Sequence, residues 1–85
     1  MWHVYVLRCG DGTFYTGIST DLAARVEKHN AGRGAKYTRR KLPVELVYSE
    51  SFRGRGRAGR REAEIKGMSR PEKEALWNTK PISTS

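Results

Sequence analysis

The sequence is short of cysteine, of long apolar runs and of acidic residues. Its one cysteine, Cys9, excludes an intramolecular disulfide and favours a reducing, intracellular compartment. No run approaches the ~18 apolar residues that a membrane span requires, and the first nine residues lead directly into turn residues instead of a signal peptide. We therefore expect a soluble cytoplasmic protein that makes no membrane contact.

The shortage of acidic residues gives the chain a strong positive charge. Seventeen Lys and Arg residues stand against nine Asp and Glu residues, a formal net charge of +8 at pH 7. Such an excess on a small chain favours a polyanionic partner, most often nucleic acid. A well-solvated basic surface is the alternative, but the cations gather in clusters, which favours nucleic acid.

Three segments are rich in β-branched and aromatic residues, and we predict them to be strands: 2–8, 13–18 and 44–52. The turn "CGDG" separates the first two, so they should form a hairpin. A chain of 85 residues allows one domain. We place that domain at 1–78 and expect a disordered tail at 79–85.

Helices are predicted between and after these strands. Thr20 is a candidate N-cap for a helix over 21–30, and the "SRPE" stretch that starts at Ser69 is a capping-box pattern for a last helix. Another helix is expected at about 58–66, although Gly59 favours a later start because glycine inside a helix costs ~1 kcal/mol. The segment "GRGAKYTRRKLP" should be a basic loop. The order ββαβαα describes an α+β domain with a small three-stranded antiparallel sheet flanked by helices.

A carboxylate lies on the predicted core-facing side of the 58–66 helix. At 100° per residue, Ala58, Glu62 and Ile65 share one narrow stripe, with Glu62 at its centre. A buried ionised carboxylate is costly unless a cation or strong donors meet it. Glu62 is therefore either a partner of one of the arginines, or a metal ligand or acid–base group that lines a cleft.

The 21–30 helix carries two basic residues at the edge of its apolar stripe. Leu22 and Val26 define the stripe, and Arg25 and His29 lie together on its border at spacing i,i+4. From this border a cation can reach past the helix towards the sheet. The alternative is a snorkelling arginine beside a surface histidine.

The two tyrosines of the hairpin depend on the length of its loop. With an odd loop, Tyr5 faces Tyr15 directly, and Gly17 on the same face leaves a gap that a ligand can approach. With an even loop, the two tyrosines lie on opposite faces. A cross-strand aromatic pair that only stabilises the sheet is the other interpretation.

These residues resemble the GIY-YIG nuclease domain. The tripeptides "VYV" at 4–6 and "YTG" at 15–17 are similar to the paired tripeptides of that family. The resemblance continues through "GISTDLAARVEKHN", "GAKYT", "LPVELVYSESF" and "REAEIK", and is strongest to small stand-alone bacterial members, with the junction-cleaving branch next. Val4 replaces the first glycine, and Val6 and Thr16 replace isoleucines, whereas both tyrosines and Gly17 are retained.

The resemblance implies catalytic roles for five residues. Glu62 matches the metal-binding glutamate of the family, and Arg25 matches the arginine that stabilises the scissile phosphate. Tyr5 and Tyr15 match the two motif tyrosines, one of which helps to activate the attacking water. His29 matches a position that is held by His or Lys near that base.

A single carboxylate favours one divalent ion, Mg²⁺ or Mn²⁺ held by Glu62, over a two-metal site. We predict that Tyr5 is the base and that His29 lowers its effective pKa, since tyrosine with its usual pKa of ~10 is a poor base at neutral pH. Tyr15 then orients water or phosphate. The choice between the two tyrosines stays open.

Two basic segments supply candidate contacts to nucleic acid. In the first, cations surround Tyr37, a combination that suits phosphate contacts and base stacking, and the second is the arginine-rich stretch 53–61. Solvated flexible loops are the alternative. The predicted nucleic-acid-binding residues are Gly17, Lys36, Tyr37, Arg39, Arg40, Lys41 and Arg61.

The sequence thus predicts a metal-dependent endonuclease that hydrolyses phosphodiester bonds in DNA during repair, recombination or processing. Its selectivity should be structure-directed or only weakly sequence-dependent, because phosphate contacts carry no sequence information. Branched and single-stranded DNA are candidate substrates, RNA is not excluded, and no protein partner is indicated. The alternative is a module of the same fold that binds DNA or RNA without cutting it.

Overall fold

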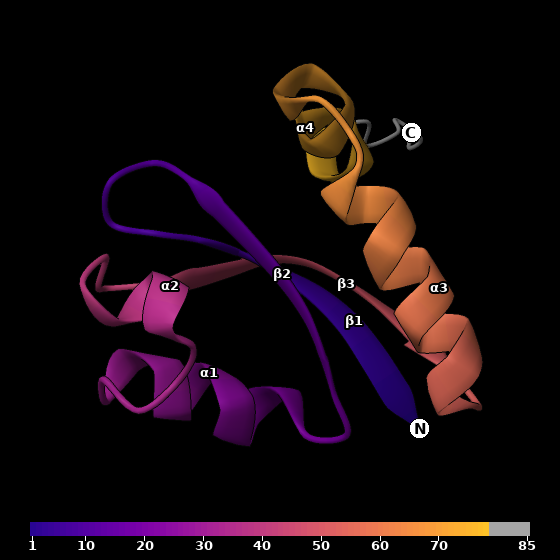
Figure 1. Cartoon of the computed structure of the whole chain (residues 1–85), viewed down its shortest axis with the longest axis horizontal. Coiled ribbons are helices and arrows are strands. Elements are labelled where there is room, and N and C mark those ends of the chain that lie inside the picture. Colours follow the sequence, from indigo (N-terminus) through magenta and orange to yellow (C-terminus); the bar gives the residue numbers. More distant parts are fainter. Residues whose placement is uncertain (79–85) are drawn as a thin grey trace.

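A three-stranded antiparallel sheet forms the centre of the structure, a computed structural model that describes residues 1–78 (Figure 1). The strands are β1 (Trp2–Arg8), β2 (Phe14–Ser19) and β3 (Glu45–Phe52), in the spatial order β2-β1-β3. The predicted strands and the α+β class are confirmed. The tail predicted at 79–85 lies outside the described residues.

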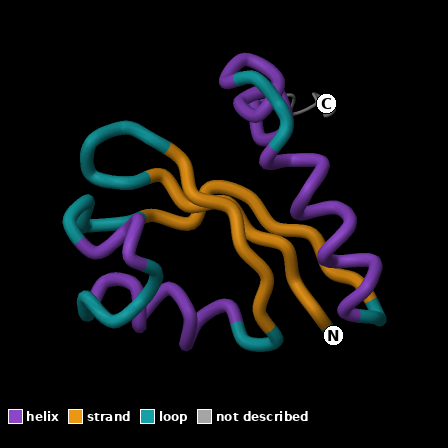
Figure 2. The backbone as a smooth tube through the Cα atoms, in the orientation of Figure 1, coloured by secondary structure: helices purple, strands orange, loops and turns teal. Residues whose placement is uncertain are grey.

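The central strand β1 buries side chains on both faces of the sheet. Val4 and Val6 are fully buried on one face, and Tyr5 and Leu7 are buried on the other. This alternation follows from the period of two along a strand. Figure 2 shows the three strands side by side, with helices on both sides of them. One strand therefore holds two small cores together.

Helices cover both faces. α3 (Arg55–Lys66) and α4 (Arg70–Asn78) pack on the Val4–Val6 face, where Ala58 and Ile65 of α3 are fully buried. α1 (Leu22–Asn30) packs on the opposite face and contributes its apolar stripe to that core. Figure 1 shows α1 and α3 on opposite sides of the sheet.

Two helix starts differ from the predictions. Asp21, and not Thr20, is the N-cap of α1, and its side chain accepts a hydrogen bond of 3.1 Å from the backbone N–H of Ala24. α3 begins at Arg55, three residues earlier than predicted, and contains Gly59 in its interior. A Cβ at Gly59 would meet no atom within 4 Å, so packing does not require glycine there.

The segment predicted as a basic loop contains a short helix, α2 (Lys36–Arg39). Thr38 is fully buried in it, and its backbone N–H and hydroxyl both bond to the carbonyl of Ala35. A four-residue helix is too short to be stable by itself, although Lys36 and Arg39 are good helix formers. Thr38 also bonds to His29 of α1, a tertiary contact that the local sequence does not reveal.

The capping box at Ser69 is confirmed. The Ser69 backbone N–H donates to the Glu72 carboxylate at 2.8 Å, and the Glu72 N–H donates to the Ser69 hydroxyl at 3.4 Å. Along the described part of the chain, none of the helices combines the length and the apolar character that crossing a membrane demands.

Candidate active site

The hairpin register places both motif tyrosines on one face of the sheet, but not as direct partners. Tyr5 lies opposite Gly17, and Tyr15 lies opposite Leu7. The hairpin loop has an odd number of residues, as the same-face arrangement requires. It spans the five residues 9–13, so Tyr5 pairs with Gly17, two positions beyond the predicted partner Tyr15. The rings lie diagonally, with centroids 6.4 Å apart.

The predicted gap above Gly17 does not exist in the structure. A Cβ at Gly17 would lie 2.6 Å from the Tyr5 hydroxyl and 3.2 Å from the Tyr15 ring, so the phenol of Tyr5 fills that space. Gly17 is needed because it lets the Tyr5 ring lie flat across β2. It supports the site and is not a surface for a ligand.

His29 connects Tyr5 to α2 through both nitrogens of its ring. The His29 side chain is fully enclosed, with Nε2 3.2 Å from the Tyr5 hydroxyl and Nδ1 2.7 Å from the Thr38 hydroxyl. Thr38 donates its only hydroxyl hydrogen to the carbonyl of Ala35 at 3.0 Å. It therefore accepts from Nδ1–H, which leaves Nε2 unprotonated and able to accept the hydrogen of Tyr5.

The surroundings of His29 keep the ring neutral and fixed in place. Burial, together with the positive charges of Arg25 and Lys28, lowers the pKa of His29 below its usual value. A Cβ at Gly34 would clash with Nδ1 and lie 2.6 Å from Cγ of the same ring. The backbone at Gly34 thus closes the pocket of His29 from one side, and any side chain there would displace the imidazole.

Tyr5 is surrounded by the other predicted site residues, yet its pKa moves opposite to the prediction. Burial, the largest effect, and the neighbouring Tyr15 raise the pKa of Tyr5 to about 12; Arg25 lowers it and Glu62 raises it. The expected lowering by His29 is therefore wrong for the free protein. The phenol stays protonated and donates to Nε2 of His29.

Arg25 is half-buried on α1 and has no carboxylate partner among residues 1–78. Its charge reaches both Tyr5 and His29. Arg25 also lines a pocket of about 240 Å³ at the start of α1, together with Asp21 and Lys28. An unpaired guanidinium in this position is available for an anion.

Glu62 extends from α3, between the buried residues Ala58 and Ile65, and its side chain is 23% exposed. Its partner is Lys66 at 3.3 Å, not an arginine. Within the described chain no group of three or more His, Cys, Asp or Glu residues converges as a metal site. One accessible carboxylate suits a divalent ion that keeps most of its water and takes its remaining ligands from phosphate.

A pocket of about 260 Å³ opens beside the edge strand β2. Tyr15 and Tyr37 line it with stacked rings, 5.9 Å between centroids, and the ammonium of Lys41 lies 3.8 Å from the centroid of the Tyr37 ring. Lys66 and Lys73 line the same pocket from α3 and α4. The pocket thus combines aromatic faces with cations, which suits a base and its phosphates.

The other predicted contact residues divide into two groups. Lys36, Arg39 and Arg40 are exposed in and after α2, as a role at the surface requires. Arg61, by contrast, donates to Glu50 at 3.0–3.2 Å and to Glu64 at 2.8 Å. Two carboxylates already occupy its guanidinium, and this pairing argues against Arg61 as a phosphate contact.

Sequence reasoning missed four residues of the site. Thr38 fixes the His29 tautomer, Gly34 closes the His29 pocket, and the pocket beside β2 is lined by Lys66 and Lys73. The "GAKYT" stretch that contains Gly34 and Thr38 was part of the resemblance, but it gave no hint of a contact with His29. The two lysines lie in helices whose docking angle the sequence does not fix.

The fold is that of a GIY-YIG domain. Residues 1–75 match the GIY-YIG catalytic domain, and the chain belongs to this family. Similar chains are small UPF0213 proteins of archaea and bacteria. A UPF0213 protein from Halobacterium salinarum is 57% identical, and the match covers 91% of this chain and 100% of the relative. A UPF0213 protein from Streptococcus agalactiae is 52% identical, and the match covers 84% of this chain and 81% of the relative.

Two solution NMR structures of relatives share the fold. The UPF0213 protein BH0048 from Bacillus halodurans is 43% identical with a TM-score of 0.57, and covers 100% of this chain and 86% of its own. The protein EF2693 from E. faecalis is 39% identical with a TM-score of 0.58, and the match covers 87% of this chain and 80% of EF2693.

Proposed function

We propose that this protein is a divalent-metal-dependent endonuclease that hydrolyses phosphodiester bonds in DNA. The observation that carries the proposal is the chain of contacts from Thr38 through His29 to Tyr5, with Arg25 and Glu62 both within electrostatic reach of the Tyr5 phenol. A domain that only binds nucleic acid has no need of a buried histidine held in one tautomer beside a phenol.

The proposed proton path follows the hydrogen bonds. The water oxygen attacks phosphorus while the P–O bond to the leaving oxygen breaks, and that oxygen departs with the bonding electron pair. The proton of the water passes to the Tyr5 oxygen, and the proton of Tyr5 passes at the same time to Nε2 of His29. A concerted transfer is required because the Tyr5 pKa of about 12 disfavours a free phenolate at neutral pH. The neutral His29 ring has one vacant nitrogen for that proton.

Arg25 and Glu62 complete the proposed chemistry. The guanidinium of Arg25 can hold two phosphate oxygens and offset the charge that develops on them. Glu62 would hold Mg²⁺ or Mn²⁺, which when bound stabilises negative charge on the phosphate and the leaving oxygen. GIY-YIG nucleases generally depend on divalent metal, and one carboxylate fits one ion. Lys66 would have to release Glu62 when the ion binds.

The substrate side of the proposal rests on the stacked Tyr15 and Tyr37 rings and the cations around them. These groups recognise a phosphate backbone and the face of any base, so we propose structure-directed or weakly sequence-selective cutting of branched or single-stranded DNA. Such activity fits repair, recombination or nucleic-acid processing. RNA is tested as a substrate beside DNA in the experiment below. We also propose a cytoplasmic location, with which the unpaired Cys9 agrees.

Two carboxylates of α3 provide the deciding experiment. Glu62→Gln and Glu64→Gln each remove one negative charge from the same helix, but the Glu64 side chain is 63% exposed and pairs with Arg61. We expect Glu62→Gln to reduce kcat by about a hundredfold or more, and Glu64→Gln to change kcat less than about twofold.

Cleavage is measured with Mg²⁺, Mn²⁺ or EDTA on flapped, branched and single-stranded DNA and on matched RNA. The proposal predicts that EDTA abolishes cutting and that DNA is cut faster than RNA. Equal rates for wild type and Glu62→Gln would overturn the role of Glu62. Salt-sensitive binding with no cutting under any metal would establish the alternative, a binding module on this fold.

A further inference from the structure

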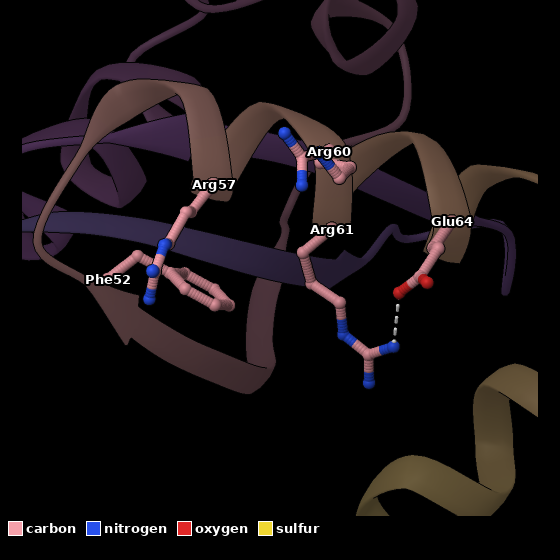
Figure 3. A pocket seen from close by; sticks show the side chains of 5 residues that line it. All are labelled: Phe52, Arg57, Arg60, Arg61 and Glu64. Carbon is pink, nitrogen blue, oxygen red and sulfur yellow. Dashed lines mark hydrogen bonds and ion pairs between the residues drawn. The ribbon is translucent and has the colours of Figure 1, made fainter.

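A second cationic surface lies on α3 and is separate from the catalytic residues. A pocket of about 310 Å³ is lined by five residues, the α3 patch: Phe52, Arg57, Arg60, Arg61 and Glu64. Figure 3 shows Arg57 beside the Phe52 ring, and Arg61 turned towards Glu64. None of these residues lines the pocket beside β2, so the two basic surfaces do not share a wall.

The charges of the α3 patch are not balanced within the fold. Both nearby carboxylates, Glu50 and Glu64, bond to Arg61. Arg57 and Arg60 are exposed and have no ion-pair partner among residues 1–78. Two guanidinium groups on successive turns of one helix thus remain free for an external anion.

The helix positions of these residues separate the patch from Glu62. At 100° per residue, Glu62 and Lys66 lie on one flank of α3, and Arg57 and Glu64 lie on the other. Gly56, Gly59 and Ala63 lie on the outer side of the helix between the flanks, and Arg60 borders them on the side of Arg57. A Cβ at Gly56 or Gly59 would meet nothing within 4 Å, so no contact in the fold accounts for these glycines.

A row of small residues bordered by the free guanidinium groups of Arg57 and Arg60 suits a polymer that crosses the helix. Glycines let a partner backbone approach the helix closely, and the bordering arginines can bind its phosphates. Phe52, the one aromatic side chain that lines the patch, is half-buried because it packs against the Val4–Val6 core. This favours the paired backbone of a duplex over unpaired bases, which need an open ring for stacking.

We infer that the α3 patch binds the phosphate backbone of a DNA duplex that flanks the cleavage site. The inference rests on the proposed nuclease function and extends it: α3 presents Glu62 to the scissile bond on one flank, and Arg57 and Arg60 hold an adjoining duplex arm on the other. The chain is 37 Å in its longest dimension, which corresponds to about eleven base pairs at about 3.4 Å per step.

The test is a pair of double variants with the same loss of charge. Arg57→Gln/Arg60→Gln removes the two free cations of the patch. Arg8→Gln/Arg33→Gln removes two exposed cations that line none of the three pockets, of which Arg8 pairs with Glu45 at 2.8 Å. Binding of a duplex of about 20 base pairs is measured in EDTA at several salt concentrations, and thermal unfolding checks that each variant is folded.

We expect the patch variant to bind at least about tenfold more weakly. The slope of log affinity against log salt should fall by about two, since each phosphate contact contributes about 0.9. The control variant should lose less than about threefold. In cleavage assays on the same duplex extended by a flap, the patch variant should raise KM and leave kcat unchanged, because the contact is remote from the scissile bond.

The outcomes separate this inference from the nuclease proposal. Wild-type affinity in the patch variant, or an equal loss in both variants, would overturn the inference and leave the nuclease proposal intact. Patch-dependent binding without cleavage would support the surface and contradict the catalytic role. If wild type binds no duplex at any salt concentration, the inference is wrong.

Discussion

His29 accepts one hydrogen bond and donates another, and only one tautomer satisfies both. Thr38 takes the hydrogen of Nδ1 because its own hydroxyl is committed to Ala35. Tyr5 then donates to Nε2. Among residues 1–78, Nε2 of His29 is the side-chain acceptor of the Tyr5 hydroxyl. The basicity of Nε2 depends on Thr38, which bonds to the other nitrogen of the ring. We therefore propose that Thr38 is a positioning residue.

Replacing Thr38 by valine tests this role. Thr38→Val keeps the size of the side chain but leaves the His29 Nδ1–H and the Ala35 carbonyl without the hydroxyl, so we expect kcat to fall by about tenfold or more. The unfolding free energy should also fall by about 1–3 kcal/mol.

Thr38→Ser is the matched control, because it restores the hydroxyl and should recover most of kcat. The measurement is a pH profile of kcat for the three proteins, which a merely structural role would not displace. Wild-type kcat and an unchanged profile in Thr38→Val would show that the threonine does not set the tautomer.

The lowered pKa of His29 predicts that stability depends on pH. In the folded protein the ring stays neutral, whereas in the unfolded chain it takes up a proton below its ordinary pKa of about 6.5. The unfolded state then binds more protons, so the unfolding free energy should decrease as the pH falls below about 6.5.

Urea unfolding at pH 8 and pH 5 measures this effect, with His29→Gln for comparison. The variant should lose less stability than wild type between the two pH values, because it lacks the titrating ring. Equal losses in the two proteins would mean that the carboxylates, and not His29, control acid unfolding.

Replacing glycine by alanine should have opposite effects on stability at two positions, Gly34 and Gly59. At Gly34, between α1 and α2, an added Cβ would clash with the His29 ring, so Gly34→Ala should lower the unfolding free energy by about 1–3 kcal/mol. At Gly59, inside α3, the same Cβ meets nothing, so Gly59→Ala should raise stability by up to about 1 kcal/mol.

Thermal and urea unfolding of the two variants decide this prediction, and each is the control for the other. The Gly34 variant should also lose cleavage activity, since the imidazole can no longer reach Tyr5. Destabilisation by both substitutions would mean that α3 is not a regular helix at Gly59.

Among the helices and strands, those that depend on their own residues and on neighbours in the sequence were predicted correctly. The three strands follow from their β-branched and aromatic residues, and α4 follows from the Ser69 capping box. The start of α1 was wrong by one residue because Thr20 and Asp21 are both good N-caps. α2 was missed because four residues are too few for a helix to be predicted from local sequence, and the Thr38–His29 contact that anchors it joins residues nine positions apart.

In the molecule as a whole, the resemblance and the helix stripes identified the five residues that the fold brings together around Tyr5. They did not predict the surroundings of these side chains, which set the pKa of Tyr5 and the ion-pair partners of Arg61. The raised pKa of Tyr5 depends on burial across Gly17, and the partners of Arg61 depend on how α3 docks against β3. Both are products of tertiary packing, which spacing along a chain does not encode.

The shared strand β1 predicts that the two cores unfold together. Val4 and Val6 pack on α3 while Tyr5 and Leu7 pack on α1, so neither core survives the loss of this strand. Ile65→Ala, on the α3 side, should lower the unfolding free energy by about 2–5 kcal/mol. That is a large part of the about 5–15 kcal/mol typical of small domains.

The cooperativity is measured by following urea unfolding of Ile65→Ala with two probes. Far-UV circular dichroism reports all elements, and tryptophan fluorescence reports Trp2 on β1 and Trp77 on α4. Because β1 belongs to both cores, the midpoints should shift together and the slope m should stay unchanged. If fluorescence changed before circular dichroism, α3 and α4 would detach first, and Glu62 would then be lost from the site while Tyr5 and His29 remained in place.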